Sequence, residues 1–241
     1  MRIAVLADIH ANLEALEAVC ADLVLRRPDA VICLGDLVGY GPDPERVVRR
    51  IIDLGYLAVM GNHEAALTSR KAREWLNFQA KENNILTESM LSEESLSFCA
   101  GLPRSLSFAN ACFVHGFPPD SVLAYVYLVA DERINRLFAE AKCRLYFVGH
   151  THDLTLISQT PAGLSRTPLL PGVTPLPRDY PAIVNAGSVG QPRDLDSRAK
   201  YLLWDSEEWT VEVVALRYAV ATTISKMRAL GLPDSYADRL G

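Results

Sequence analysis

The N-terminal part of the chain alternates between short apolar runs and longer segments with helical spacing. The apolar runs occupy residues 2–7, 30–35 and 56–61, and a polar residue follows each of them. Between them, residues 12–26 and 43–55 carry apolar side chains at helical intervals, and a glycine closes the second segment. This order of strand, helix and strand predicts parallel strands in one sheet with helices on its faces.

The rest of the chain predicts a helical segment, more strands and a helical tail. Helical spacing covers residues 64–101 and 130–143, and returns from Ala219 onwards. Residues 160–181 hold six prolines and little periodicity, which predicts a long loop, either a surface excursion or a rim over the site. The remaining apolar runs predict strands at residues 105–109, 111–116, 145–149, 154–158, 182–190, 200–205 and 209–218.

No internal repeat or low-complexity segment interrupts the chain, which favours one domain over residues 1–241. Residues 64–110 are interpreted as a helical insertion near the site, and residues 219–241 as a C-terminal helical tail. The chain has 241 residues with 49% hydrophobic composition, enough to bury a substantial core.

Composition and charge exclude several classes of partner. The formal net charge is −5, which argues against bulk binding to nucleic acids or anionic membranes. No apolar stretch reaches the roughly 18 residues that a membrane helix needs, and the N-terminus is typical of a first strand and not of a signal peptide. The 5 cysteines form no CxxC pair, which favours buried free thiols and a cytoplasmic protein.

Polar clusters stand where the strand-like runs end, and they contain all 5 histidines of the chain. In parallel α/β sheets, ligands bind at the carboxyl ends of the strands. We therefore expect these residues to converge, although they are spread along the sequence. They are Asp8, His10, Asp36, Asn62, His63, His115, His150 and His152.

Each of these residues also has an ordinary structural explanation. Asp36 and Asn62 could cap the helices that follow them, a single His115 is often a core residue, and GHTH could be a tight turn. Together these explanations would require independent coincidences at five strand ends, so a metal site is the better interpretation. Mixed nitrogen and oxygen donors without cysteine suit Mn²⁺, Fe or Zn²⁺. The donors are too many for one ion, and two ions could clamp a displacement at phosphorus.

The motifs D-x-H, G-D, G-N-H-E, H-G and G-H-T-H, in this order, resemble the calcineurin-like metallophosphoesterase family over residues 1 to 205. GDLVGYGPDP and NAGSVGQPRD are similar to the small prokaryotic, phosphodiesterase-like branch, although Ala186 stands where that branch often has proline. The resemblance implies an α/β fold, a four-layer α/β sandwich of two facing mixed β-sheets flanked by helices.

The resemblance also implies roles for the clustered residues. Two divalent metal ions are expected, Mn²⁺ first, with Fe, Zn, Ni or Mg as alternatives. A hydroxide bridging them would attack phosphorus directly, and His63 would protonate the leaving oxygen. His63 would lie beside the substrate phosphate, and Asn62 and Arg193 are further candidates for contact with the substrate. The metal ligands implied are Asp8, His10 and His152 for one ion, Asn62, His115 and His150 for the other, and Asp36 between them.

One departure narrows the expected function. Serine/threonine phosphatases of this family have G-D-x-V-D-R-G, and here Gly39 and Tyr40 replace the Asp–Arg pair. This removes a carboxylate partner of the catalytic histidine and a guanidinium for the phosphate, which argues against protein phosphatase activity. Arg193 is the nearest cation in a motif, either as a substrate contact or as an ordinary exposed arginine.

The expected function is hydrolysis of phosphodiester or phosphomonoester bonds in a small substrate. The alternative is a catalytically silent or weakly active scaffold on the same fold, and the intact motif residues favour the enzyme. A nuclease on structured DNA fits poorly with the acidic charge. The sequence predicts no membrane partner and leaves assembly into a homo-oligomer open.

Overall fold

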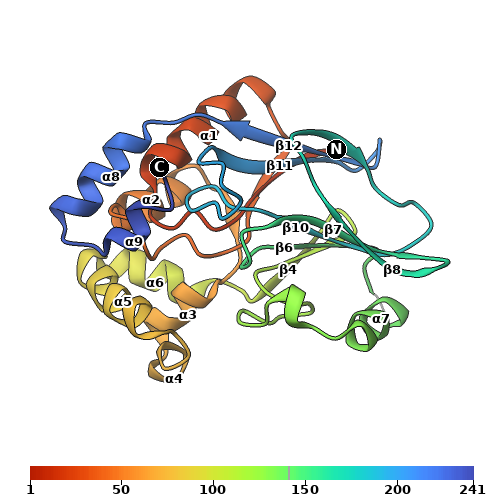
Figure 1. Cartoon of the computed structure of the whole chain (residues 1–241), viewed down its shortest axis with the longest axis horizontal. Coiled ribbons are helices and arrows are strands. Elements are labelled where there is room, and N and C mark those ends of the chain that lie inside the picture. The colour runs from red at the N-terminus through yellow and green to blue at the C-terminus, as the bar shows by residue number, and fades with distance from the viewer. Residues whose placement is uncertain (141) are drawn as a thin grey trace.

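Two mixed six-stranded sheets face each other in the computed structural model, which describes residues 1–140 and 142–241 (Figure 1). The first sheet has the order β3 (Leu57–Ala58), β2 (Ala30–Cys33), β1 (Arg2–Leu6), β11 (Ala199–Asp205), β12 (Thr210–Leu216) and β9 (Gly172–Pro175). The second has the order β4 (Ser105–Phe108), β5 (Ala111–Val114), β6 (Leu145–Val148), β10 (Ala182–Ala186), β7 (Leu154–Thr160) and β8 (Gly163–Pro168).

The apolar run of β1 is unbroken because both of its faces are buried. Ile3 and Val5 belong to the core between the two sheets, whereas Ala4 and Leu6 belong to the core under the helices of the first sheet. All four side chains are fully buried. The parallel pairing of β1 with β2 and of β2 with β3 agrees with the order of elements predicted from the sequence.

Helices cover both outer faces and complete four layers. α1 (Leu13–Arg26) and α2 (Pro44–Asp53) pack on the first sheet. α7 (Asp131–Ala139) packs on the second sheet through Ile134 and Phe138. The predicted fold class, a four-layer α/β sandwich of two mixed sheets flanked by helices, is confirmed. No helix among the described residues is both long and apolar enough to cross a membrane.

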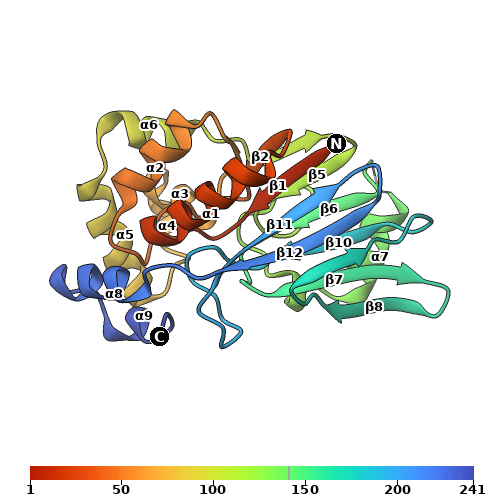
Figure 2. The same cartoon turned by 90° about the horizontal axis from the view of Figure 1, so that it is seen from above.

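The other helices gather at one end of the two sheets (Figure 2). The segment predicted to be helical over residues 64–101 is divided into separate helices, and the first of them already begins at Asn62. The tail forms two helices. The helices of the first segment are α3 (Asn62–Thr68), α4 (Arg70–Arg73), α5 (Phe78–Met90) and α6 (Glu93–Gly101), and those of the tail are α8 (Val220–Ala229) and α9 (Asp234–Ala237). A separate 3₁₀ turn lies at Val126–Leu128.

The prediction of a long loop over residues 160–181 is wrong, because this segment contains β8 and β9. β8 pairs with β7 across a tight turn in which Thr160 is opposite Gly163. Both new strands lie at sheet edges, where a residue without an N–H is tolerated, and Pro168 and Pro175 end them. The prolines therefore hid the strand pattern in the sequence, although they do not prevent β8 and β9 from forming.

Two further boundaries differ from the predictions. The run expected as a strand over 182–190 leaves the sheet after Ala186, where the chain turns toward the site. The helix expected over 130–143 ends at Ala139, and position 141 lies outside the described residues. The single domain over residues 1–241 stays a prediction.

Glu45 on α2 accepts hydrogen bonds from Ser92, the residue before α6. These bonds make the free energy of unfolding depend on pH. The Glu45 carboxylate accepts hydrogen bonds from the backbone N–H and the hydroxyl of Ser92, both at 2.9 Å, and from Arg49 Nε at 3.1 Å. Burial raises the pKa of Glu45, but hydrogen bonds from Ser92, Ser95 and Arg49 outweigh burial and lower this pKa to about 2. A depressed carboxyl pKa stabilises the fold above the unfolded pKa of about 4.3, and this contribution is lost as the pH falls toward 2.

We therefore expect Glu45→Gln to be less stable than the unmodified protein at pH 7, with a difference that shrinks between pH 5 and pH 2. Urea unfolding of both proteins at pH 7 and pH 3 measures it. Glu93→Gln, at an exposed position of the first turn of α6, controls for the lost charge. A difference of the same size at both pH values would contradict this interpretation of Glu45.

Candidate metal centre

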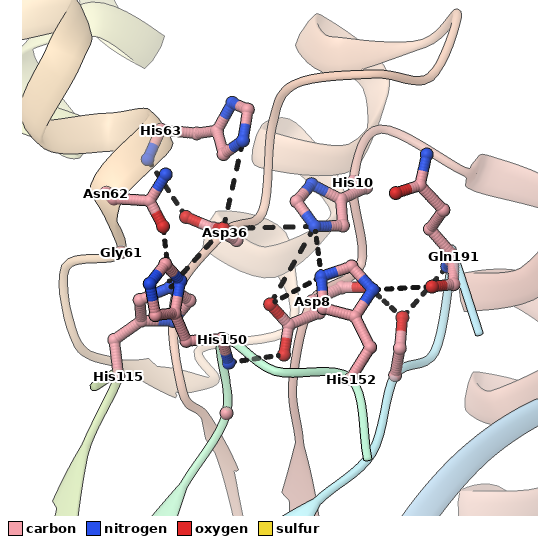
Figure 3. A network of polar contacts seen from close by, with 12 residues as sticks. Asp8, His10, Asp36, Gly61, Asn62, His63, His115, His150, His152 and Gln191 are labelled. Atoms are coloured by element: carbon pink, nitrogen blue, oxygen red, sulfur yellow. Dashed lines mark hydrogen bonds and ion pairs between the residues drawn. The ribbon is translucent and has the colours of Figure 1, made fainter. Parts of the chain in front are cut away.

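The polar residues that follow the strands meet at one edge of the two sheets (Figure 3). They come from the carboxyl ends of β1, β2, β5 and β6 and from the start of α3. Their side chains are at most 7% exposed. The structure thus brings together Asp8, His10, Asp36, Asn62, His63, His115, His150 and His152. Arg193, the remaining predicted residue, is exposed and is not one of the buried residues of the site.

The first group of donors contains two imidazoles whose bare nitrogens face each other. His10 Nδ1 lies 3.1 Å from the carbonyl of Val38, and His152 Nδ1 lies 2.5 Å from that of Gln191. A carbonyl only accepts, so each Nδ1 carries the proton and Nε2 of a neutral ring has a free lone pair. These Nε2 atoms are 3.1 Å apart. Asp8 Oδ1, which has no hydrogen-bond partner among the described residues, is 3.3 Å from His152 Nε2. A cation bound between these atoms would remove the repulsion between their lone pairs.

The second group repeats this arrangement on the other side of the centre. His115 Nδ1 donates to the carbonyl of Leu34 at 2.8 Å, and His150 Nε2 donates to that of Leu123 at 3.1 Å. The nitrogens left over, His115 Nε2 and His150 Nδ1, face each other at 3.1 Å. Asn62 Oδ1 lies 3.0 Å from His115 Nε2 and adds an oxygen donor.

Asp36 lies between the two groups. Its Oδ2 is 3.3 Å from His115 Nε2, 3.8 Å from His10 Nε2 and 4.0 Å from His63 Nε2. Burial opposes the charge of Asp36, but His115 and His63 outweigh it and hold the pKa of this carboxyl well below its usual range. Burial likewise lowers the pKa of His115, yet Asp36 reverses the direction and raises this pKa to about 9. The buried carboxylate therefore favours a positive charge beside it, which either a proton on His115 or a bound cation would supply.

The donor chemistry fits divalent cations. Asp8, His10 and His152 each offer one ligand atom, and these atoms lie within 4.8 Å of one another. The same holds for Asp36, His115 and His150, and a third set joins His10, Asp36 and His63. Mixed imidazole and carboxylate donors without thiolate are typical of catalytic divalent-metal sites.

The backbone of the site is held in an unfavourable conformation. Positive φ is uncommon for residues other than glycine and costs on the order of 1–3 kcal/mol for each residue. Such angles persist only where the surroundings require them, and they cluster at functional sites. The site residues with positive φ are Asp8, His10, Asp36, His150 and His152.

Glu64, which was not predicted as a site residue, connects the loops of the site through hydrogen bonds. This fully buried carboxylate accepts hydrogen bonds from the backbone N–H groups of Asp36, Val38 and Gly61 at 2.9, 3.1 and 2.8 Å. Burial, together with the nearby charge of Asp36, raises the pKa of Glu64 to about 7. Its position in the first turn of α3, three residues after Gly61, is the capping-box spacing and could have identified it.

Gly39 makes room for the imidazole of His63. Its φ is +88°, and a Cβ there would lie 2.2 Å from His63 Nδ1, an atom without a hydrogen-bond partner in the described residues. The ring thus occupies the space in which a side chain at position 39 would lie.

We expect Gly39→Ala to displace the imidazole of His63 and to lower kcat about 10²-fold, since a shift of about 1 Å in a reacting group has this effect. Gly55→Ala is the matched control, because Gly55 has φ +63° and nothing within 4 Å of the added Cβ. It should lose some stability and keep its activity. Steady-state kinetics and thermal unfolding of both variants test this, and equal activity losses would exclude steric displacement of His63.

The buried donors at the carboxyl ends of the strands of this two-sheet sandwich form a candidate centre for divalent metal ions. The family model described as calcineurin-like phosphoesterase matches residues 1–154. The chain belongs to this family.

Relatives resemble the chain over its whole length. The uncharacterized protein MJ0912 of Methanocaldococcus jannaschii is 32% identical over 242 residues, which cover 99% of this chain and 96% of that protein. The crystal structure of a metallophosphoesterase from Sphaerobacter thermophilus has a TM-score of 0.86 at 35% identity, covering 100% of this chain and 98% of that one. The hypothetical protein PH1004 of Pyrococcus horikoshii has the same fold at 18% identity, with a TM-score of 0.78 over 99% of this chain and 97% of that one.

Proposed function

We propose that the protein is a dinuclear phosphoesterase that hydrolyses the phosphodiester or phosphomonoester bond of a small substrate. The observation that carries the proposal is the pair of facing imidazole nitrogens, 3.1 Å apart, on each side of Asp36. Two cations satisfy both pairs, and Mn²⁺ suits their nitrogen and oxygen donors. The residues that would hold them are Asp8, His10, Asp36, Asn62, His115, His150 and His152.

Bound divalent ions would supply a lowered pKa for water and positive charge for the phosphate oxygens. The residues of the chain supply orientation and a proton. Asn62 Oδ1 faces His115, so its amide N–H₂ group remains for a phosphate oxygen. His63, 4.0 Å from Asp36 Oδ2, is placed to protonate the leaving oxygen. Burial lowers the pKa of His63, whereas the nearby charge of Asp36 opposes this shift and favours the protonated ring that a general acid needs.

The test uses protein stripped of metal and reloaded with one ion at a time. Phosphomonoesters, phosphodiesters and nucleotides form the substrate panel. We expect Mn²⁺ to support hydrolysis and elemental analysis to approach two equivalents of metal per chain. Full activity at a plateau of one equivalent would contradict the dinuclear proposal. Metal binding without hydrolysis of any substrate would favour the scaffold alternative.

A further inference from the structure

A hollow of about 700 Å³ lies beside the metal centre and has a wall from the C-terminal part of the chain. A second hollow of about 480 Å³ shares Tyr40, Asn77 and Tyr125 with the first, and the site residues Asn62 and His150 line it. We call the first one the C-terminal hollow. Its lining includes Tyr40, Tyr125, Arg193, Tyr236, Asp238 and Arg239.

Tyrosine rings connect this hollow to the metal centre. The ring of Tyr125 stacks on His150 with centroids 3.9 Å apart and planes inclined by 13°. The ring of Tyr40 lies 4.6 Å from that of His63 and 4.9 Å from that of Tyr236 on α9. Tyr40 and Tyr125 are only partly buried, so part of each side chain remains available for a flat group that stacks.

The polar groups of the hollow favour an anion with further hydrogen-bond capacity. Arg193 and Arg239 are exposed and line the hollow together with Asp238. Guanidinium groups bind phosphate oxygens well. The hydroxyl of Tyr236 is buried and has no hydrogen-bond partner among the described residues, although the residue is only 3% exposed.

Hydrogen bonds connect α8, near the C-terminal wall of the hollow, to residues close to the metal centre. Lys226 on α8 donates to Glu14 at 2.5 Å and to Asp43 at 2.7 Å. Thr223 donates to Asn12, two residues after His10, at 3.1 Å. These contacts join α8 to Asn12, to the first turn of α1 and to the residue before α2.

A buried lysine donates three hydrogen bonds within the segment that follows Arg193. Lys200 is 2% exposed and donates to Asp194 at 2.9 Å, to the carbonyl of Arg198 at 3.2 Å and to the carbonyl of Asp196. These hydrogen bonds connect three positions of this segment through one buried ammonium group. Such cross-links in the walls of a site would reduce the entropic cost of binding.

We propose that the C-terminal hollow is a nucleotide subsite. The nucleobase stacks on the accessible parts of Tyr40 and Tyr125, and a phosphate of the nucleotide binds Arg193 and Arg239. A volume of about 700 Å³ lies in the range of roughly 300–1,000 Å³ that small-molecule sites have. The inference rests on the proposed function, because the nucleotide is the part of the substrate that positions its scissile phosphate at the metal centre.

Calorimetric titration of the metal-free protein tests the subsite without turnover. AMP should bind at least about tenfold more tightly than ribose 5-phosphate, which lacks the base, and than adenosine, which lacks the phosphate. Arg239→Gln should weaken AMP about tenfold and leave adenosine unaffected. The matched control is Arg228→Gln on α8, 65% exposed and outside the lining, which should change neither affinity.

The aromatic part of the subsite has its own matched pair. Tyr125→Leu should remove most of the advantage of AMP over ribose 5-phosphate. Tyr127→Leu should keep this advantage, because Tyr127 is 59% exposed and does not line the hollow. Equal binding of AMP and ribose 5-phosphate would overturn the inference, as would equal effects of Arg239→Gln and Arg228→Gln.

Failure of the subsite is distinguishable from failure of the proposed function. Hydrolysis of bis(p-nitrophenyl) phosphate by the Mn²⁺-loaded protein, without preferential binding of AMP, overturns the subsite alone. Specific binding of AMP without hydrolysis of any ester by any metal-loaded form overturns the proposed function alone.

Discussion

Asp36→Asn is expected to lower kcat/KM about 10³-fold or more and to reduce the metal content below two equivalents per chain. Asp36 Oδ2 is within 3.3 Å of His115 Nε2 and 3.8 Å of His10 Nε2, so this one carboxylate faces both groups of donors. Asparagine keeps the shape and can still accept the backbone N–H of His63, which now binds Asp36 Oδ1 at 2.9 Å. It lacks the buried negative charge that attracts the cations.

Arg193→Ala is the comparison for this experiment. Arg193 is exposed and is not one of the buried residues of the site, so its loss should leave the metal content at two equivalents and should cost less activity. Elemental analysis and steady-state kinetics of both variants provide the measurement. Similar losses of kcat/KM in the two variants would show that Asp36 does not have the central place proposed for it.

His63→Gln should lower the rate about 10²–10⁴-fold for esters with an alkyl or ribosyl leaving group, the usual effect of losing a general acid. Esters of p-nitrophenol should retain much of their rate, because p-nitrophenolate departs without a proton. His63 Nδ1 has no hydrogen-bond partner in the described residues, so this nitrogen leaves no broken hydrogen bond behind.

Metal content decides between the two roles that the geometry allows for His63. Its ring can contribute to a set of donors with His10 and Asp36, so it could in principle bind an ion. As a general acid it binds none, and His63→Gln should still contain two equivalents of metal. A variant that loses an ion, or that slows esters with good and poor leaving groups equally, would exclude the general-acid role.

The local sequence determined the α/β core and the set of residues that gather at its edge. β1, β2 and β6 were recognisable because strands buried on both faces leave unbroken apolar runs. The polar residues after these runs predicted the cluster, because parallel strands end at the same edge of a sheet. Their order along the chain also indicated the family that the comparison over residues 1–154 shows.

The tertiary structure alone decided the features that depend on distant pairing. β8 and β9 have little apolar character of their own and are strands because they pair with β7 and β12 at the edges. Glu64 gave only a local capping signal, and its hydrogen bonds to Asp36 and Val38 in the loop after β2 appear only in the folded chain.

The C-terminal hollow had no sequence signal at all. Tyr236 meets Tyr40 across almost two hundred residues, and Arg239 reaches the side chain of Gln191 at 3.4 Å. Local periodicity records only which face of an element is buried and not which element covers it. The wall that the last helices build beside the metal centre was therefore decided by long-range packing.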